Sequence, residues 1–517
     1  MWYWTLILSV AQSAPLGEPD SARLSASLRE AALEEGPPVQ VVVEWESTAS
    51  SMPARVLALA PSARAEAQAS TALQLWVPRD RLRALAALEG VTRVRAPFYA
   101  RPKEVTSEGV GEVLLEDWGR EGITGDGVRV DVLDVGFAGY KALVGEDLPI
   151  GLEVALQSED QEEAHGTAVG EIIYDMAPGI SLVFHQFATD VEYLELMESL
   201  LNEGDSDVIN ASIGFDNIWS LDGSSPYSQM VDYAEDSGVV YVAPSGNEVG
   251  NYVIGTLSDS DDNTLLEIDG LEAIPLGVSN GEVQVSVRWS ETMGEAAVDL
   301  DIAVLDENGE VCGESNDYQG GEGFPFESVA CELAGTEAWL VLVGEEVALD
   351  GLTAFVYSPF GVDDSVASEA MTLTLPSDAR GAITVGAYYA YDMELADYSS
   401  QGPTEDGRIK PDLVGPTGVS TESLGALMGE GSSFSAPHVA GLVALMLEAD
   451  PDMEPGEVRD YLHEHALDLG EAGPDNVYGW GAARSGPLPE SCGCATPRGG
   501  SMPNWGWIPV LLLWRRR

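Results

Sequence analysis

The chain has 517 residues, which is enough for two or three domains with separate cores. It carries 87 acidic and 24 basic side chains, a formal net charge of −63. A surface of this sign repels phosphate groups, which argues against DNA, RNA and anionic membranes as partners.

Residues 1–14, MWYWTLILSVAQSA, place a short apolar run ahead of small residues. This pattern is typical of a secretory signal peptide, although no basic residue precedes the apolar run. We therefore expect a protein that is secreted or held on the outer cell surface.

Residues 39–101 form the next unit. Strands are predicted at 39–45, 73–77 and 91–95, and helices at 54–67 and 79–88, which gives a β-α-β-α-β order. The unit is rich in arginine, opposite in sign to the acidic remainder, and we expect it to dock there electrostatically. The arginines concerned are Arg79, Arg81, Arg83, Arg93 and Arg95.

From 112 to 250 strands alternate with helices, a pattern typical of a parallel sheet with helices on both faces. Residues 128–136 predict a strand that ends at Asp134, with Asp131 as the alternative carboxylate on that strand. The segment AHGTAVG opens a helix with His165 at its start. Parallel sheets gather functional groups at the carboxyl ends of their strands, so these residues are candidates for one site.

The alternation stops after residue 250. Short alternating strands separated by glycine and acidic turns predict an inserted β-sandwich at 251–375. Cys312 and Cys331 in this segment predict one disulfide if the compartment is oxidising. Four carboxylates are candidate ligands of a structural calcium ion, although ordinary solvent-facing strand carboxylates are the favoured interpretation. They are Asp299, Asp301, Asp306 and Glu307.

The α/β pattern resumes at 376–485. GSSFSAPHVAG at 431–441 and the apolar run behind it predict a buried helix with Ser433 in its first turn. The partial positive charge of a helix N-terminus favours the oxyanion formed when a serine oxygen attacks a carbonyl. An ordinary serine cap is the alternative, and a nucleophilic serine also needs a base and an orienting carboxylate. His165 and Asp134 can supply both.

The order Asp134, His165, Ser433 and the motifs around these residues resemble the subtilases, the subtilisin-like (S8) serine peptidases. HGTA and GSSFSAPHVAG are similar to the family's HGTH and GTSMSAPHVAG, and the chain order differs from that of chymotrypsin-like and α/β-hydrolase triads. The chain departs from the family pattern without losing a proton-transfer group. The departures are Val135, Ala168 and Ser432.

The resemblance implies further site residues. The segment 239–248 is similar to the family strand and turn whose asparagine completes the oxyanion hole, which assigns that role to Asn247. The segment 207–214 resembles the family's VINMSLG strand, which holds the substrate as an added strand. This match places Ser212, Ile213 and Gly214 along the substrate cleft.

The resemblance also suggests a role for residues 39–101. A small domain ahead of the peptidase is similar to the ferredoxin-like subtilase propeptide, an intramolecular inhibitor that is cut off, here near 101–111. A retained accessory domain that is never cleaved is the alternative.

Residues 486–501 are predicted to be a linker and 502–517 a hydrophobic tail that ends in three arginines. With Cys492 and Cys494 upstream, the tail resembles the MYXO-CTERM sorting tail, which implies membrane contact through the tail only. A hydrophobic tail with two idle thiols is the alternative.

The predicted fold is a subtilisin-like α/β domain with helices on both faces of its sheet, preceded by a ferredoxin-like α+β propeptide and interrupted by a β-sandwich. The predicted function is a serine endopeptidase that hydrolyses protein or peptide substrates through an acyl-enzyme. Its chemistry requires no cofactor. The alternatives are a surface binding or adhesion protein on the same scaffold and an esterase with the same triad.

Overall fold

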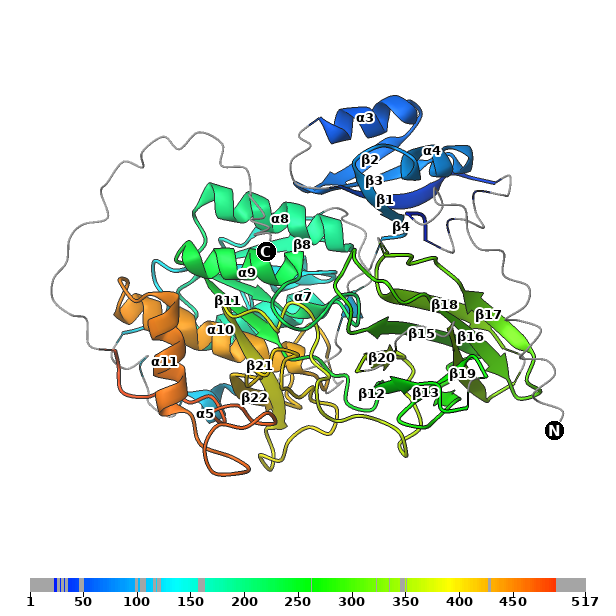
Figure 1. Ribbon diagram of the computed structural model, residues 1–517. Helices are drawn as coiled ribbons and strands as arrows, with labels where there is room; N and C mark the ends of the chain where they lie inside the picture. The colour runs from blue at the N-terminus through cyan, green and yellow to red at the C-terminus, as the bar shows by residue number, and fades with distance from the viewer. Residues whose placement is uncertain are drawn as a thin grey trace, which may run out of the picture.

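The computed structural model describes residues 23–489, except 26–27, 29–31, 33–35, 46–50, 98–100, 103–107, 115–117, 119–121, 157–162, 262, 322, 334, 345–348, 350 and 426–428. The predicted signal peptide, most of the linker and the sorting tail lie outside this part. Three larger sheets organise the described residues, together with one two-stranded ladder (Figure 1). None of the described helices combines the length and the apolarity that crossing a bilayer requires.

The central sheet has seven strands in the order β22-β21-β11-β9-β6-β8-β7. Each neighbouring pair is parallel, so all the carboxyl ends lie at one edge of the sheet. The strands are β6 (Arg129–Asp134), β7 (Glu153–Ala155), β8 (Ser181–Gln186), β9 (Val208–Ala211), β11 (Val240–Pro244), β21 (Ala382–Tyr389) and β22 (Leu413–Thr417).

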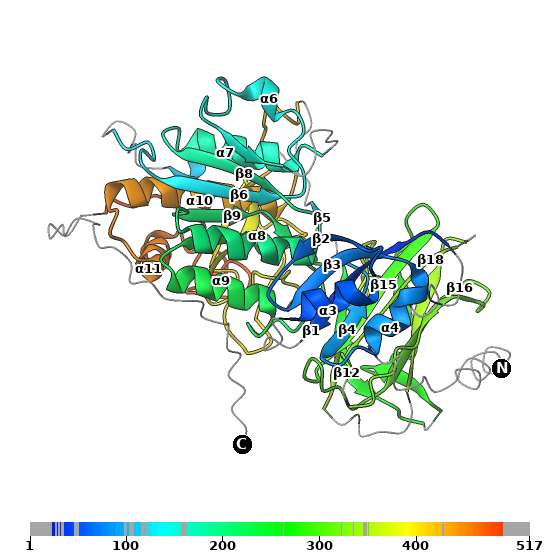
Figure 2. The same ribbon diagram turned by 90° about the horizontal axis from the view of Figure 1, so that it is seen from above.

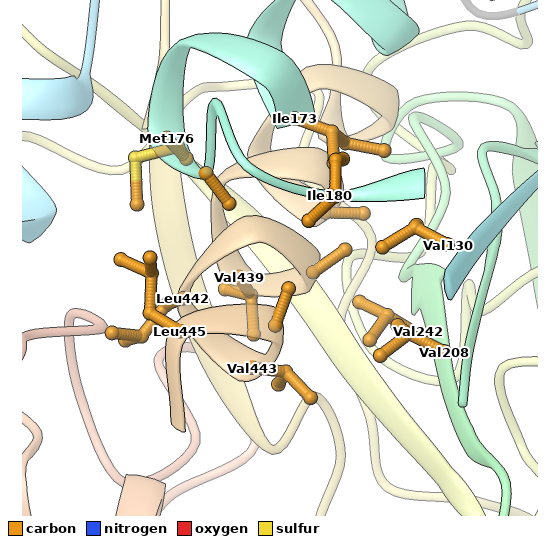
Figure 3. Packing of buried hydrophobic residues seen from close by; sticks show 14 of the residues in the cluster. Val130, Ile173, Met176, Ile180, Val208, Val242, Val439, Leu442, Val443 and Leu445 are labelled. Carbon is orange, nitrogen blue, oxygen red and sulfur yellow. The ribbon is translucent and has the colours of Figure 1, made fainter. Parts of the chain in front are cut away.

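Helices cover both faces of this sheet because side chains on its strands alternate between the two sides. Val240 and Val242 of β11 join the core beneath α7 (His165–Met176) and α10 (Ser432–Ala449), part of which Figure 3 shows. Tyr241 and Ala243 of the same strand face α8 and α9 instead. The bounds of the remaining helices are α8 (Asp190–Glu203), α9 (Pro226–Asp236) and α11 (Pro455–His465).

Helix α10 is the most deeply buried element of this unit. Every residue from Ser432 to Met446 is buried, as expected of a helix that is apolar on all sides. Gly441 lets α10 approach α7 closely, because a Cβ at this position would lie 2.4 Å from Cβ of Met176. The predicted buried helix is therefore present, and its N-terminus lies beside that of α7.

The N-terminal unit is a four-stranded antiparallel sheet in the order β2-β3-β1-β4. This order and the two helices give the predicted ferredoxin-like fold. One element was missed, because 54–67 was predicted to be a single helix, whereas the helix ends at Leu59 and Arg64–Gln68 is a strand. Pairing with β3 overrides the helix propensity of this alanine-rich segment. The elements are β1 (Val39–Trp45), α3 (Met52–Leu59), β2 (Arg64–Gln68), β3 (Ala72–Val77), α4 (Leu82–Ala86) and β4 (Val91–Arg95).

The inserted segment leaves the central sheet after β11 and returns at β21, which are neighbouring strands. It forms a nine-stranded antiparallel sheet that runs from β17 at one end to β18 at the other. The predicted disulfide between Cys312 of β17 and Cys331 of β18 is present, and it joins these two ends into a nearly closed structure. The strands are β12 (Tyr252–Ser258), β13 (Leu265–Ile268), β14 (Ile274–Leu276), β15 (Glu282–Trp289), β16 (Leu300–Asp306), β17 (Val311–Ser315), β18 (Phe326–Glu332), β19 (Ala338–Gly344) and β20 (Thr353–Tyr357).

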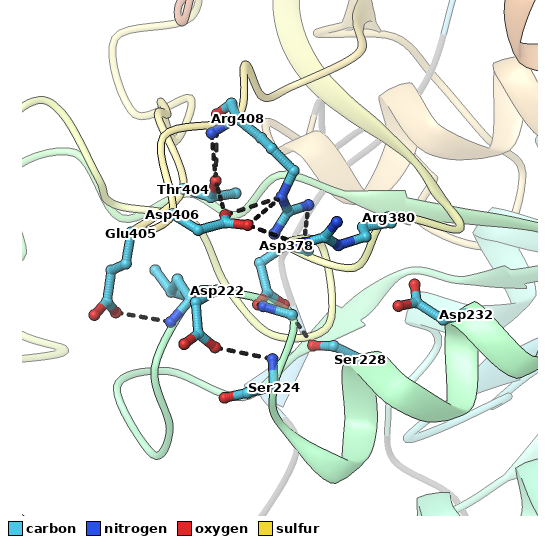
Figure 4. A network of polar contacts seen from close by, with 12 residues as sticks. Asp222, Ser224, Ser228, Asp232, Asp378, Arg380, Thr404, Glu405, Asp406 and Arg408 are labelled. Atoms are coloured by element: carbon cyan, nitrogen blue, oxygen red, sulfur yellow. Dashed lines mark hydrogen bonds and ion pairs between the residues drawn. The ribbon is translucent and has the colours of Figure 1, made fainter. Parts of the chain in front are cut away.

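A buried ion pair fixes the inserted sheet to the central unit. Arg288 of β15 donates from Nη2 to Oε1 of Glu405 over 2.6 Å, and its guanidinium lies over the ring of Phe355. The same Glu405 oxygen accepts from the backbone N–H of Leu221 over 2.7 Å. Glu405 belongs to the loop network around Arg408 that Figure 4 shows, so the insertion is anchored to a framework that is itself held together by polar contacts.

Candidate active site

Asp134 is the last residue of β6 and His165 the first residue of α7. Oδ2 of Asp134 lies 2.8 Å from Nδ1 of His165, and the side chains are 0% and 2% exposed. Gly166 permits this approach, because a Cβ there would lie 2.6 Å from Cβ of Asp134. Since the carboxylate can only accept, Nδ1 carries the proton, which makes Nε2 the basic nitrogen of the ring.

The alternative carboxylate, Asp131, has different partners. It accepts from Nε2 of His185 over 2.7 Å and from Oγ of Ser206 over 2.7 Å, and it pairs with Arg129. It lies three residues before the end of β6, whereas Asp134 stands at the carboxyl edge. The structure therefore brings Asp134, and not Asp131, to His165.

Ser433 is the second residue of α10, so its backbone N–H is one of the first four of the helix, which lack an intrahelical acceptor. The ring of the next residue, Phe434, lies perpendicular to the His165 ring, with centroids 5.3 Å apart. Among the residues that the structure describes, the buried Oγ of Ser433 has no hydrogen-bond partner. The serine thus stands one residue from an aromatic ring that packs against the imidazole.

Asn247 follows β11 and is half-buried. Its Oδ1 accepts from the backbone N–H of Ser432 over 2.8 Å and from Oγ of Ser432 over 2.9 Å. Oγ of Ser432 also accepts from the backbone N–H of Gly246 over 3.1 Å. A serine at this position, where the family has threonine, therefore retains the hydroxyl that joins this turn to the start of α10.

The predicted cleft residues lie on and beside β10 (Ile213–Gly214), and all three are buried. Oγ of Ser212 accepts from Nδ2 of Asn210 over 2.9 Å. β10 pairs in antiparallel fashion with β5 (Arg101–Pro102), with Gly214 opposite Arg101 and Ile213 opposite Pro102. A segment of the chain itself is thus added to β10 as an extra strand.

After β5 the chain is described again from Glu108. Oε1 of Glu108 accepts from Oγ of Ser420 over 2.6 Å, and Gly109 lies against Pro416 and His438. These contacts lie where β22 ends, at the carboxyl edge of the central sheet. The described residues on either side of 103–107 therefore lie at β10 and at the end of β22.

His438 is buried beside this segment, and its Nδ1 donates to the carbonyl of Phe434 over 2.7 Å. Burial lowers the pKa of His438 to about 4, so its ring is neutral at pH 7.

The N-terminal sheet docks on α8 on one side and faces the inserted sheet on the other (Figure 2). Arg95 of β4 forms a buried ion pair with Asp190 in the first turn of α8. Nε2 of Gln74 donates to Oε1 of Glu192 over 3.2 Å on the same helix. Hydrophobic contacts accompany them, because Val42 belongs to the core of α8 and α9.

The prediction that five arginines dock on the acidic unit holds for Arg95 and needs correction elsewhere. The guanidinium of Arg93 lies 4.4 Å from the ring centroid of Phe324 in the inserted segment, a cation-π contact. Arg81 pairs with Asp80 of its own unit, and Arg83 is exposed. Position on the sheet, which composition does not reveal, decides which arginine meets a carboxylate.

Sequence reasoning missed Asp190 as the anchor of the N-terminal unit. One signal was available, because Thr189 and Glu192 have the spacing of a capping box and form one at the start of α8. That motif predicts a helix N-terminus, but it does not indicate that β4 lies in front of it.

The predicted calcium ligands have local roles in the structure. Oδ1 of Asp299 accepts from the backbone N–H of Gln319 over 2.9 Å. Asp306 accepts from the backbone N–H groups of Asn308 and Glu310 in the turn after β16. The hydrogen bond from Glu310 has the largest effect, and together the two bonds hold the pKa of Asp306 below its ordinary value. Calcium binding at this position stays a prediction.

Residues 362–481 match the model of the subtilase family, peptidase S8. This part of the chain, which contains α10, is therefore similar to the subtilase family. It is 24% identical over 428 residues to the minor extracellular protease Vpr of Bacillus subtilis, covering 70% of this chain and 51% of Vpr. It is 31% identical over 141 residues to the serine protease AprX of Bacillus subtilis, covering 23% of this chain and 31% of AprX.

The chain thus spans about a third to about half of the length of these two curated relatives. Among solved structures, the CspB protease of Clostridium perfringens aligns with a TM-score of 0.52 at 18% identity, covering 71% of this chain and 95% of CspB. This likeness concerns the fold. Together with the parallel sheet and its helices, it confirms the predicted subtilisin-like α/β architecture.

Proposed function

We propose that this protein is a secreted or surface-held serine endopeptidase. The observation that carries the proposal is the buried Asp134–His165 pair, whose imidazole packs edge-on against the residue after Ser433. A carboxylate, an imidazole and a serine at a helix N-terminus are the groups that acyl transfer requires. The subtilase match and the relatives named as serine proteases support the same chemistry.

In the proposed reaction, Oγ of Ser433 attacks the scissile carbonyl while Nε2 of His165 accepts its proton. Asp134 holds the imidazole by Nδ1 and stabilises the imidazolium that forms. The developing oxyanion is bound by the backbone N–H of Ser433 and by Nδ2 of Asn247. His165 then protonates the leaving amine, and water hydrolyses the acyl-enzyme by the reverse sequence of proton transfers.

The proposed substrates are proteins or peptides that bind in an extended conformation. β10 offers its edge to such a segment, and its pairing with Arg101–Pro102 indicates how a substrate would lie. Backbone hydrogen bonds supply much of the affinity in this mode and are insensitive to sequence. Ser212, Ile213 and Gly214 would therefore position the substrate and leave side-chain selection to the walls of the cleft.

The N-terminal unit is proposed to be an intramolecular inhibitor that is removed by cleavage. β5, which follows this unit, pairs with the edge of β10. Glu108 contacts Ser420, just after the end of β22. We expect the bond that is cut to lie between Pro102 and Glu108. Mass spectrometry of the mature chain would show this end, and it would also test the predicted signal peptide and the MYXO-CTERM-like tail.

The decisive experiment replaces the nucleophile. Ser433→Ala should abolish both casein hydrolysis and release of the N-terminal unit, and Ser435→Ala on the same buried helix is the matched control. Hydrolysis of casein by Ser433→Ala at the wild-type rate would refute the proposal.

Two further measurements separate the alternative functions. Failure of a fluorophosphonate probe to label the processed wild type would favour a binding protein. Turnover of esters without turnover of peptides would favour an esterase.

A further inference from the structure

A cavity of about 300 Å³ lies where the inserted sheet meets the central unit. The central unit contributes residues that directly follow β10, and the inserted sheet contributes β15, β18 and the end of β20. Its walls combine apolar and polar side chains. The apolar ones include Phe215, Ile218, Val285, Phe326, Val329 and Ala330, and the polar ones include Asp216, Gln284, Ser286 and Ser328. This volume can accommodate one or two side chains.

The cavity continues the line of the substrate cleft. Phe215 lines it and directly follows Gly214, the residue that pairs with Arg101. Because this pairing is antiparallel, the chain upstream of Arg101 runs toward Phe215. Pro97, four residues upstream of Arg101, lines the same cavity. Four residues span at most about 14 Å when extended, so Pro97 lies within about 14 Å of Arg101, which pairs with β10.

The seam between the two units at this place is built from buried polar contacts. Nδ2 of Asn217 donates to the carbonyl of Phe355 over 2.9 Å and to Oγ of Ser286 over 3.2 Å, which joins the two units. Asp216 accepts from Oγ1 of Thr374 over 2.8 Å and from the hydroxyl of Tyr357 over 2.9 Å. Asp216 and Ser286 are thus engaged in holding the framework, and an apolar occupant would contact the apolar side chains of the wall, among them Phe215, Val285 and Phe326.

We propose that the inserted sheet extends the substrate cleft. Once the N-terminal unit has left, the cavity binds an apolar side chain of the substrate, four residues upstream of the residue that pairs with Gly214. In the uncleaved chain the residue at this position is Pro97, which forms part of the cavity wall. This inference rests on the proposed peptidase function and gives the insertion a role in substrate selection.

The test compares two internally quenched peptides on the processed wild-type protein. The long peptide has the sequence of residues 96–108, and the short one begins at Ala100. We expect kcat/KM to be about tenfold higher for the long peptide, the effect of placing one apolar group in a pocket. Replacing the residue that corresponds to Pro97 by aspartate in the long peptide should remove this advantage.

Variants of β18 provide the second arm. Ser328 lines the cavity, so Ser328→Trp fills it and should reduce the long-to-short ratio of kcat/KM to about one. Glu332→Trp is the matched control, since Glu332 is exposed on the same strand and face but lies outside the cavity, and the ratio should stay at the wild-type value. Ala330→Trp serves the same purpose if Ser328→Trp does not fold.

The outcomes separate the two proposals. A wild type that cleaves both peptides equally well, or a Ser328→Trp variant that keeps the wild-type ratio, overturns the subsite and leaves the peptidase proposal standing. A processed wild type that cleaves neither these peptides nor casein removes the proposed function and the subsite with it.

Discussion

The backbone N–H of Ser432 donates to Oδ1 of Asn247 over 2.8 Å. This hydrogen bond fixes the amide of Asn247 at the residue before the proposed nucleophile. Because Oδ1 is directed at Ser432, Nδ2 is the atom left to serve as a donor to a substrate.

Asn247→Leu should therefore lower kcat by a factor of about 10² to 10³, with a much smaller change in KM. The donor is needed where negative charge develops in the transition state, and substrate binding by β10 is independent of it. Steady-state kinetics on a peptide substrate, normalised by active-site titration, measure the effect. A variant that loses affinity but keeps kcat would show that Asn247 positions substrate and does not stabilise an oxyanion.

The two carboxylates of β6 should respond differently to the same change. Asp134→Asn should lower kcat by about 10⁴, because an amide no longer stabilises the imidazolium or selects the correct tautomer of His165. Asp131→Asn disrupts contacts with His185 and Ser206 instead, so it should cost about 1 to 3 kcal/mol of unfolding free energy. Kinetics and urea unfolding of both variants separate the roles, and similar kinetic losses in the two would contradict them.

The ion pair between Arg95 and Asp190 should contribute strongly to docking of the N-terminal unit. In a Ser433→Ala background, where this unit is expected to stay attached, Arg95→Ala should lower the unfolding free energy by about 3 to 5 kcal/mol, since it removes the cationic partner of the buried Asp190 carboxylate. Arg83→Ala is the control, because this exposed arginine should change stability by less than about 0.5 kcal/mol. Equal effects of the two substitutions would argue against the buried pair as an anchor.

Asp378 should make stability depend on pH in a predictable direction. Burial raises its pKa to about 6, although Ser228 and the backbone N–H of Gly223 donate to its carboxylate (Figure 4). The folded state therefore binds this proton more tightly than the unfolded state, in which the pKa is about 4. The contribution of Asp378 to stability is fully present below about pH 4 and is lost as pH rises to about 6.

Asp378→Asn removes this titration. The unfolding free energy of the variant, relative to that of the wild type, should rise by about 2 to 3 kcal/mol between pH 4 and pH 7. Urea unfolding in the Ser433→Ala background at several pH values measures the difference without self-digestion. A constant difference across this range would show that Asp378 does not titrate in it.

Much of the central unit was predictable because its elements carry local signals. As expected, β6 ends at Asp134 and α7 begins at His165. Both boundaries can be located in the sequence, because the apolar run of a buried strand stops at one residue and the apolar period of a helix starts at another. The chain order Asp134, His165, Ser433 and the motif around Ser433 predicted the parallel α/β architecture, because they resemble the subtilase pattern. The pairing of Cys312 with Cys331 followed from their place in one segment.

The remainder depends on long-range contacts that sequence patterns do not encode. The strand Arg64–Gln68 has the composition of a helix and becomes a strand only because β3 lies beside it. The choice of Arg95 as the anchor depends on where β4 ends relative to α8. The cavity beyond Gly214 is formed by three segments far apart in the chain, and each of them alone predicts only a strand or a loop.

Asn247 and Ser432 are 185 positions apart, and the whole nine-stranded insertion lies between them. Closing so long a loop is slow and entropically costly unless the intervening segment is already compact. Assembly of the hydrolytic centre should therefore come late, after the insertion has folded. A molecule whose insertion is misfolded should therefore fail to bring Asn247 to Ser432, which makes the proposed oxyanion hole depend on the folding of the insertion.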